Sequence, residues 1–144
     1  MIERLVLALA VVALAYAAFV WLRRRDGRVT VVTDDAYVGS TDLGSALGFH
    51  ATLVQFSTPM CSRCPGTARM LAAIAGEDPR LEHVDIDASE RLDLAARFDI
   101  LRTPTVLVVD GNGKVAARMS GTISVAQVRE ALDSVPSTGT DYAI

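Results

Sequence analysis

The chain of 144 residues is poor in the residues on which several common functional sites depend. It contains only two cysteines and two histidines, whereas a structural zinc site takes about four such ligands. His50 and His83 are neither close to the cysteines nor spaced as in a zinc finger, so no resident metal is expected. The net charge is −3, and no basic stripe interleaved with aromatic residues supports nucleic-acid binding. A glycine-rich phosphate loop is also absent from the sequence.

Hydrophobic residues make up 51% of the chain and are concentrated at its N-terminus. Leu5 to Leu22 is an unbroken apolar run of 18 residues. That length is at the lower limit for crossing a hydrocarbon core of about 30 Å at a rise of about 1.5 Å per residue. A single transmembrane helix is the preferred interpretation. The alternatives are a cleaved signal peptide, for which Ala13-Leu14-Ala15 offers a small-residue cleavage pattern, and a helix buried in a soluble domain.

The charges that flank this run predict its orientation. Arg23 to Arg25 and Arg28 follow it, whereas Glu3, Arg4 and the terminal amine precede it. Cytoplasmic flanks carry the excess of Lys and Arg, so the remainder of the chain is predicted to face the cytoplasm. A secretory signal has its positive charge ahead of the apolar segment, and this reversed order argues against export. An extracytoplasmic placement is the alternative.

The length suits one compact domain with a short appendage. We predict a transmembrane anchor and basic flank over residues 1–25, a folded domain over 26–135 and a flexible tail over 136–144. Apart from an edge strand and turns, including one at residues 33–35, residues 26–51 are predicted to be a connector without chemistry.

Hydrophobic periodicity predicts five strands and three helices in the domain. The predicted strands are Arg28 to Val32, Leu53 to Phe56, Leu81 to Ile86, Thr105 to Val109 and Val115 to Met119. The predicted helices run from the cysteines to about Gly76, from Ser89 to Phe98, and across Val125 to Leu132. The fourth strand is almost wholly apolar, which is typical of a central strand covered on both faces. The Asp-Gly-Asn-Gly sequence that follows it predicts a hairpin turn.

Both cysteines belong to one motif, Cys61-Ser62-Arg63-Cys64, between a predicted strand and a predicted helix. This spacing lets one thiolate attack a disulfide while its partner resolves the mixed disulfide. A helix N-terminus favours thiolate over thiol, and Arg63 acts in the same direction. On spacing alone, half of a zinc site and a small structural disulfide loop stay open as alternatives.

The order of these elements, with Thr103-Pro104-Thr105 ahead of the central strand, resembles the thioredoxin superfamily over about Val29 to Val135. The resemblance implies an α/β fold with a central mixed sheet flanked by helices, here with an N-terminal transmembrane helix added. It implies that Pro104 is cis and packs against the CxxC motif, and that Thr103 pairs with an extended substrate segment. It also implies that Gly121 lets a loop approach the active site, and that no cofactor is needed beyond a redox-active disulfide.

Several positions depart from the usual thioredoxin pattern and are expected to tune the site. Met60 replaces a tryptophan, and Ser62-Arg63 replaces Gly-Pro between the cysteines, where the intervening pair influences the redox potential. Gln55 aligns with a buried acid, and His83 aligns with the lysine that partners it. Gln55 cannot take up a proton at neutral pH, so water or another group must serve. His83 is one such group, with a purely structural histidine as the alternative.

We expect a membrane-tethered thiol-disulfide oxidoreductase that reduces protein disulfides, with Cys61 as nucleophile and Cys64 as resolving cysteine. Its expected partners are protein disulfide or thiol substrates, membrane lipid, and a membrane-protein electron donor or acceptor. One alternative is an extracytoplasmic oxidoreductase of the cytochrome c maturation or disulfide-forming type. The others are a thiol-dependent peroxidase or arsenate-type reductase, and a non-catalytic thioredoxin-fold binding module.

Overall fold

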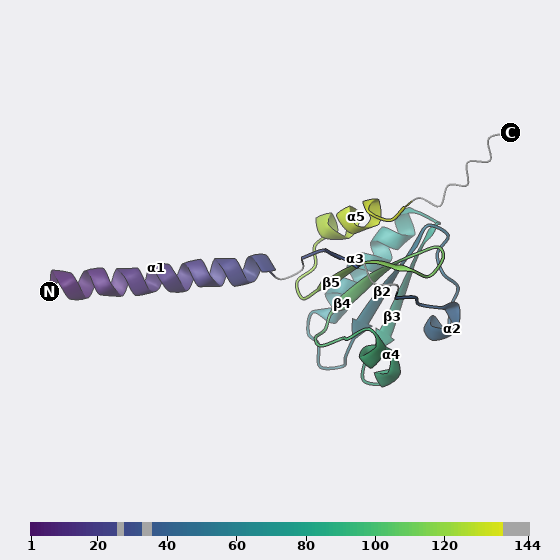
Figure 1. Ribbon diagram of the computed structural model, residues 1–144, viewed down its shortest axis with the longest axis horizontal. Helices are drawn as coiled ribbons and strands as arrows, with labels where there is room; N and C mark the ends of the chain where they lie inside the picture. Colours follow the sequence, from purple (N-terminus) through teal and green to yellow (C-terminus); the bar gives the residue numbers. More distant parts are fainter. Residues whose placement is uncertain (26–27, 33–35, 137–144) are drawn as a thin grey trace.

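A long N-terminal helix precedes an α/β domain in the computed structural model (Figure 1). The structure describes residues 1–25, 28–32 and 36–136, without the side chains of residues 23–25. In chain order the elements are α1 (Ile2–Arg25), β1 (Thr30–Val31), α2 (Ser40–Leu43), β2 (Ala51–Ser57), α3 (Cys64–Glu77), β3 (Leu81–Asp87), α4 (Leu92–Arg97), β4 (Thr105–Asp110), β5 (Val115–Ser120) and α5 (Val125–Asp133). The turn predicted at residues 33–35, and the predicted tail beyond Pro136, lie outside the described residues.

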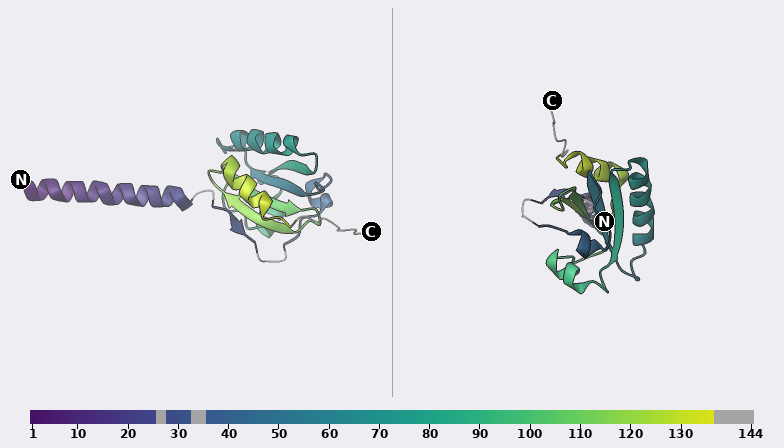
Figure 2. Two further views of the ribbon diagram at one scale, coloured as in Figure 1. Left: turned by 90° about the horizontal axis from the view of Figure 1, so that it is seen from above. Right: turned by 90° about the vertical axis from the view of Figure 1, so that its right-hand side faces the viewer.

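The five strands form one mixed sheet in the order β1-β5-β4-β2-β3. β2 pairs in parallel with β3 and antiparallel with β4, while β5 pairs antiparallel with both β4 and β1. α3 and α5 cover one face of the sheet and α4 covers the other (Figure 2). Residues 51–56 of β2 are all buried, because both faces of this strand are covered. The predicted mixed sheet flanked by helices is confirmed.

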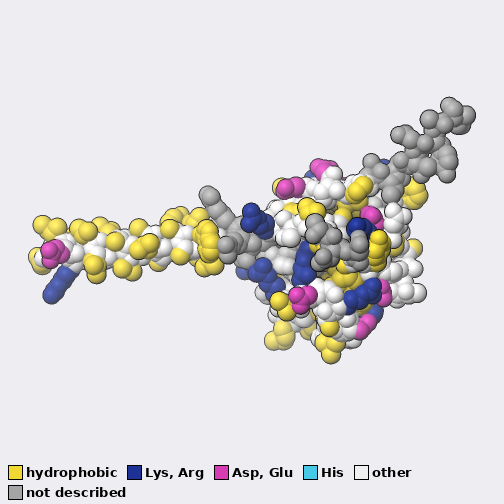
Figure 3. Space-filling view, viewed as in Figure 1, with side chains coloured by type: hydrophobic (Ala, Val, Ile, Leu, Met, Phe, Trp, Pro, Cys, Tyr) yellow, Lys and Arg dark blue, Asp and Glu magenta, His cyan; other side chains and the backbone are white. Residues whose placement is uncertain are grey.

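Helix α1 stands apart from the hydrophobic core of the domain. Its apolar segment Ile2–Leu22 spans 21 residues, none of them buried within the protein. Hydrophobic side chains cover the visible face of this helix (Figure 3). The alternative of a helix buried in a soluble domain is therefore wrong. The segment is long and apolar enough to cross a membrane, and a signal sequence meets the same criteria.

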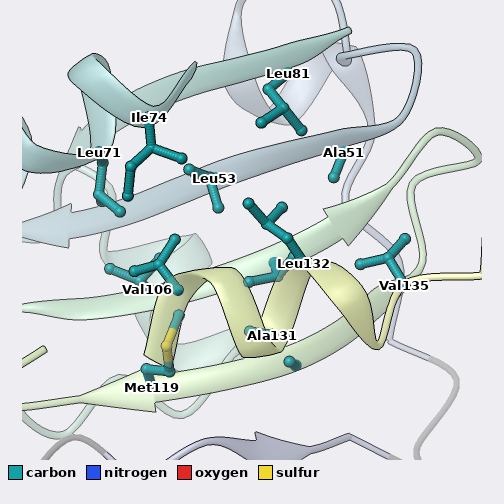
Figure 4. Close-up of a cluster of buried hydrophobic side chains, with 13 residues drawn as sticks. Ala51, Leu53, Leu71, Ile74, Leu81, Val106, Met119, Ala131, Leu132 and Val135 are labelled. Atoms are coloured by element: carbon teal, nitrogen blue, oxygen red, sulfur yellow. The ribbon is translucent and has the colours of Figure 1, made fainter. Parts of the chain in front are cut away.

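The core on the α3 and α5 face holds helix α3, and with it Cys64, against the sheet (Figure 4). Leu71 and Ile74 lie three residues apart on one side of α3 and are buried on the central strands. Truncating a fully buried leucine such as Leu71 to alanine costs about 2–5 kcal/mol. Pro65 lies in the first turn of α3, where its missing N–H has no partner in any helix. The main members of this core are Leu53, Val106, Val108, Ala117, Met119, Val128, Ala131 and Leu132.

Two predictions about the helices on the opposite face need correction. α4 begins at Leu92 rather than near Ser89, because Asp87 organises a turn ahead of it. The Asp87 carboxylate accepts the Ser89 backbone N–H at 2.8 Å, and the Asp87 carbonyl accepts the Arg91 N–H at 2.9 Å. The connector predicted over residues 26–51 contains the four-residue helix α2, which is too short to give a periodic signal.

Candidate redox site

The loop after β2 brings the two cysteines together at the start of α3. The Cys61 backbone N–H donates to the Thr58 carbonyl at 3.0 Å, and the Cys64 N–H donates to the Cys61 carbonyl at 3.3 Å. These two consecutive turns, each closed by a bond from residue i+3 to residue i as in a 3₁₀-helix, tighten the entry to α3. The prediction that Cys61 starts the helix is therefore wrong by three residues, since α3 begins at Cys64.

Cys61 and Cys64 form a disulfide, with their Cα atoms 5.5 Å apart. The two cysteines differ in exposure: Cys64 is only 4% exposed, whereas Cys61 is half-buried. Cys61 lines an open hollow of about 320 Å³ that Met60, Arg63 and Thr103 also line. Met60, at the position of the family's tryptophan, is 93% exposed at this hollow. An incoming chain thus meets the sulfur of Cys61 before that of Cys64.

The Thr103-Pro104 segment, far along the chain, forms the opposite side of this hollow. Its peptide bond is cis, and Pro104 is buried. The Thr103 hydroxyl lies 3.3 Å from that of Thr58, which links the segment to the CxxC loop. The Pro104 carbonyl accepts the Gly121 N–H at 2.9 Å. Gly121 has a φ of 87°, a conformation that glycine adopts without steric cost, so this loop reaches the site as predicted.

The buried side chain of Thr105 holds the Thr103-Pro104 segment in place through two hydrogen bonds. Its hydroxyl donates to the Arg102 carbonyl at 2.6 Å and lies 3.0 Å from the Ser120 hydroxyl on β5. Sequence reasoning identified neither contact: the bond to Arg102 is local but leaves no periodic signal, and Ser120 is 15 residues away on another strand.

Arg63, between the cysteines, crosses to the loop after β5. Its guanidinium donates to the Thr122 hydroxyl at 3.0 Å. Both side chains are exposed, so the bond contributes little to overall stability. It ties the CxxC turn to a second loop while keeping a positive charge beside the cysteines.

Gln55 and His83, which align with the family's buried acid and its lysine partner, lie on neighbouring strands but are not opposite each other. Gln55 is fully buried and donates from Nε2 to the Cys64 carbonyl at 3.0 Å, while its Oε1 has no partner among the described residues. His83 lies opposite Leu53 on the neighbouring strand, and the residue opposite Gln55 is Asp85. Burial lowers the pKa of His83, and the charge of Asp85 opposes this in part. The Asp85 carboxylate accepts the Ser57 hydroxyl at 2.6 Å.

In the described part of the chain, no group of three or more His, Cys, Asp or Glu side chains is placed to hold a metal ion. The two sulfurs of Cys61 and Cys64 are the redox-active atoms on which the site is built.

The thioredoxin family model matches residues 44–134, so this chain belongs to the thioredoxin family. The chain is 26% identical over 95 residues to thioredoxin H5 of Oryza sativa subsp. japonica, which covers 66% of this chain and 70% of that protein. The X-ray structure of Fasciola hepatica thioredoxin matches with a TM-score of 0.54 and 25% identity, over 60% of this chain and 82% of that one. Thioredoxin NaTrxh from Nicotiana alata has the same fold, with a TM-score of 0.54, 23% identity, and coverage of 60% and 75%.

Family and site together make the protein a thiol-disulfide oxidoreductase with a CxxC pair. As in thioredoxins generally, the redox-active group is the disulfide itself.

Proposed function

We propose that this protein is a membrane-tethered disulfide reductase, in which Cys61 attacks substrate disulfides and Cys64 resolves the mixed disulfide. The difference in exposure between the two cysteines is the observation that carries this assignment. A nucleophile must reach a sulfur on another protein, and Cys61 is half-buried at the edge of an open hollow. A resolving cysteine only has to reach its neighbour, which suits the 4% exposure of Cys64.

The reaction begins with both cysteines reduced. The Cys61 thiolate attacks one sulfur of the substrate disulfide, forms a mixed disulfide and expels the other substrate sulfur as a thiolate, which takes up a proton. Deprotonated Cys64 then attacks the Cys61 sulfur and expels the second substrate thiolate. The substrate gains two electrons and two protons, and the enzyme is left with the Cys61–Cys64 disulfide. An external thiol donor must reduce this disulfide before the next turnover.

Thr103 and Pro104 hold the substrate segment in this mechanism. Thr103 lines the same hollow as Cys61, and its hydroxyl is anchored to Thr58. An extended chain that pairs with the backbone here has its sulfur beside Cys61. Exposed Met60 offers an adaptable apolar contact for the same chain.

Resolution requires that Cys64 lose its proton, and the group nearest to it cannot accept one. Gln55 contacts the Cys64 carbonyl through an amide, which does not titrate near neutral pH. Water therefore takes the proton from Cys64, and Gln55 acts as a positioning residue. His83 lies level with Leu53 rather than with Gln55, which favours a structural role for it.

The proposed membrane tether and its orientation are inferred from helix α1 and the charged residues that flank it. The segment Ile2–Leu22 exposes apolar side chains along its whole length, and four arginines follow it within six residues. This charge distribution favours a catalytic domain on the cytoplasmic side. The reducing poise of the cytoplasm then favours reduction of substrates over oxidation.

Insulin reduction by the full chain in a neutral detergent, with dithiothreitol as electron donor, tests the catalytic assignment. Wild-type protein is expected to reduce insulin well above the rate of dithiothreitol alone. Cys61→Ser abolishes the increase, whereas Cys64→Ser accumulates a mixed disulfide with the substrate. Equal turnover by wild type and Cys61→Ser contradicts the assignment.

Membrane topology is tested separately, with a membrane-impermeant maleimide applied to intact cells after mild reduction. Cys61 is expected to react only after the membrane is permeabilised. Labelling of Cys61 in intact cells contradicts the cytoplasmic placement and favours an extracytoplasmic oxidoreductase. Release of the protein by carbonate extraction contradicts the tether itself.

A further inference from the structure

A second hollow, of about 320 Å³, shares no lining residue with the hollow around Cys61. Its lining comes from segments far apart in the chain, and we name it the arginine hollow: Arg28, Thr30, Arg102, Arg118 and Ser120. The volume is at the small end of the range for ligand pockets, about 300–1,000 Å³. We propose that the arginine hollow binds a phosphate group, carried by an anionic lipid headgroup or by free phosphate.

Strand pairing builds the hollow from these separate segments. Thr30 of β1 lies directly opposite Arg118 of β5. Ser120 follows two residues after Arg118, on the same side of the strand. The Thr105 hydroxyl connects Ser120 to the backbone of Arg102. Thr30, Arg118 and Ser120 are thus held in register by the sheet before any ligand arrives. The backbone of Arg102 is linked to the sheet through Thr105.

Arg118 is anchored by its guanidinium to the loop after α4. Its guanidinium donates to the Phe98 carbonyl at 2.7 Å and to the Asp99 carbonyl at 2.6 Å. A guanidinium carries five N–H donors, and these two bonds leave the others for a ligand. Both partners are neutral backbone carbonyls, so the positive charge of Arg118 is not cancelled by them.

The donor set suits phosphate better than a carboxylate. A carboxylate has two oxygens, which a single guanidinium fork can satisfy. The arginine hollow is lined by three guanidinium groups and the Thr30 hydroxyl, on segments far apart in the chain, while the Ser120 hydroxyl donates its proton to Thr105. A tetrahedral phosphate presents several charged oxygens in different directions and can use such a set. This cluster stands out in a chain whose overall charge is −3.

The position of Arg28 explains how a lipid headgroup reaches the hollow. Arg28 follows the apolar segment, which ends at Leu22, by six residues. These six residues, of which 23–25 belong to α1, cannot span more than about 15 Å. Lys and Arg side chains gather at the end of the domain that adjoins α1 (Figure 3). The lipid source rests on the proposed membrane tether, whereas the phosphate site itself does not.

The arginine hollow also adjoins the proposed substrate-binding segment. Arg102 directly precedes Thr103, which lines the hollow around Cys61. A headgroup phosphate bound to Arg102 therefore holds the Thr103 side of the active site close to the bilayer surface.

Calorimetric titration of the full chain in a neutral detergent, at constant ionic strength, tests the site with inorganic phosphate as the probe. Saturable binding is expected for wild type and for the control variant Arg129→Gln, which removes an exposed arginine on α5. The double variant Arg28→Gln/Arg118→Gln is expected to lose at least tenfold in affinity. Insulin reduction by all three proteins shows that each is folded, and tests the proposed catalytic function independently.

Nanodiscs distinguish the two sources of phosphate. Phenylglyoxal modification of Arg118, followed by mass spectrometry, is compared in phosphatidylcholine discs and in discs that also contain phosphatidylglycerol. Slower modification of Arg118 but not of Arg129 in the anionic discs supports the headgroup source. Phosphate binding with equal modification in both discs supports free phosphate as the ligand. Absence of phosphate binding together with unprotected Arg118, or equal protection of Arg118 and Arg129, overturns the proposal.

Discussion

The Gln55 side chain donates a hydrogen bond of 3.0 Å to the backbone carbonyl of Cys64. This contact gives a structural reason for an amide at the position where thioredoxins usually have an acid. The Cys64 carbonyl is in a buried part of the first turn of α3, and an ionised carboxylate has no proton to donate to it. The Gln55 amide donates a hydrogen bond to the Cys64 carbonyl, but it cannot accept the Cys64 proton.

Gln55→Asp is expected to lose the hydrogen bond to the Cys64 carbonyl and to gain a side chain that can accept a proton. Burial raises the pKa of the introduced carboxyl, so that it can accept the Cys64 proton near neutral pH. We expect about a tenfold faster release of substrate from the mixed disulfide, at the low end for general base catalysis because water already serves. The loss of the bond to the Cys64 carbonyl lowers the free energy of unfolding by about 1–3 kcal/mol.

Gln55→Asn is the matched control, because it shortens the side chain equally without adding a titratable group. Stopped-flow measurement of mixed-disulfide resolution across pH 5 to 9 separates the two variants. Identical rates and pH profiles for both would contradict a role for a proton acceptor at this position.

Arg63→Ala is expected to make Cys61 less reactive near neutral pH. Arg63 adds a positive charge to the CxxC turn, and its removal destabilises the thiolate relative to the thiol. We expect the midpoint of iodoacetamide alkylation of reduced protein to move to higher pH by less than about one unit, since the site is open to water. Thr122→Val loses the same hydrogen bond but keeps the charge, so its midpoint should stay at the wild-type pH. A shift in both variants would attribute the effect to loop position instead of charge.

Thr105→Val is expected to weaken substrate binding as well as stability. The variant removes the bonds to Arg102 and Ser120 that hold the segment before Thr103, at a cost of about 1–3 kcal/mol in the free energy of unfolding. We expect KM for insulin to rise several-fold with a smaller change in kcat.

Thr52→Val provides the control for this prediction. Thr52 is equally buried and accepts the Gly48 N–H at 2.8 Å, near the start of β2 and away from the CxxC end. It should lower stability to a similar extent and leave KM unchanged. A comparable rise in KM in both variants would show that KM follows general stability.

His83 is expected to make the fold sensitive to mild acid. Its pKa in the folded protein is below the ordinary value of 6.5 because of burial. As pH falls below about 6.5, the unfolded chain takes up a proton at this residue before the folded protein does, so stability declines. Urea unfolding at pH 7, 6 and 5 should therefore show that the free energy of unfolding falls more steeply with decreasing pH in wild type than in His83→Gln. Above pH 7 the two proteins should show the same dependence of this free energy on pH. Equal losses of unfolding free energy in wild type and His83→Gln between pH 7 and pH 5 would exclude His83 as the cause.

Local patterns in the sequence were sufficient to predict most of the strands and helices, and the resemblance to thioredoxins supplied their arrangement in layers. The apolar run in β4 and the Asp-Gly-Asn-Gly turn after it both appear where they were predicted. The start of α3 was misplaced by three residues because the turns at Cys61 are made by backbone bonds that no side-chain period records. Helix α2 was missed because four residues make barely one helical turn.

The site was predictable only where its residues are close in the chain or belong to a family motif. CxxC and Thr103-Pro104 meet that condition. The contacts from Thr105 to Ser120 and from Arg63 to Thr122 depend on strand register and loop approach, which composition does not encode. The arginine hollow is the extreme case, since Arg28 and Arg118 are 90 positions apart and meet only because β1 pairs with β5.

In the membrane-tethered arrangement proposed above, the short connection between the end of α1 at Arg25 and the start of β1 at Thr30 limits which substrates the protein can serve. On a bilayer-anchored chain, so short a link keeps Cys61 within a thin layer above the lipid. Disulfides of other membrane-anchored proteins in that layer are present at a high effective concentration, of the order of millimolar for short linkers. A disulfide held well above the membrane lies beyond the reach of Cys61 whatever its intrinsic reactivity. Selectivity of this kind is set by height above the bilayer and requires no dedicated recognition pocket.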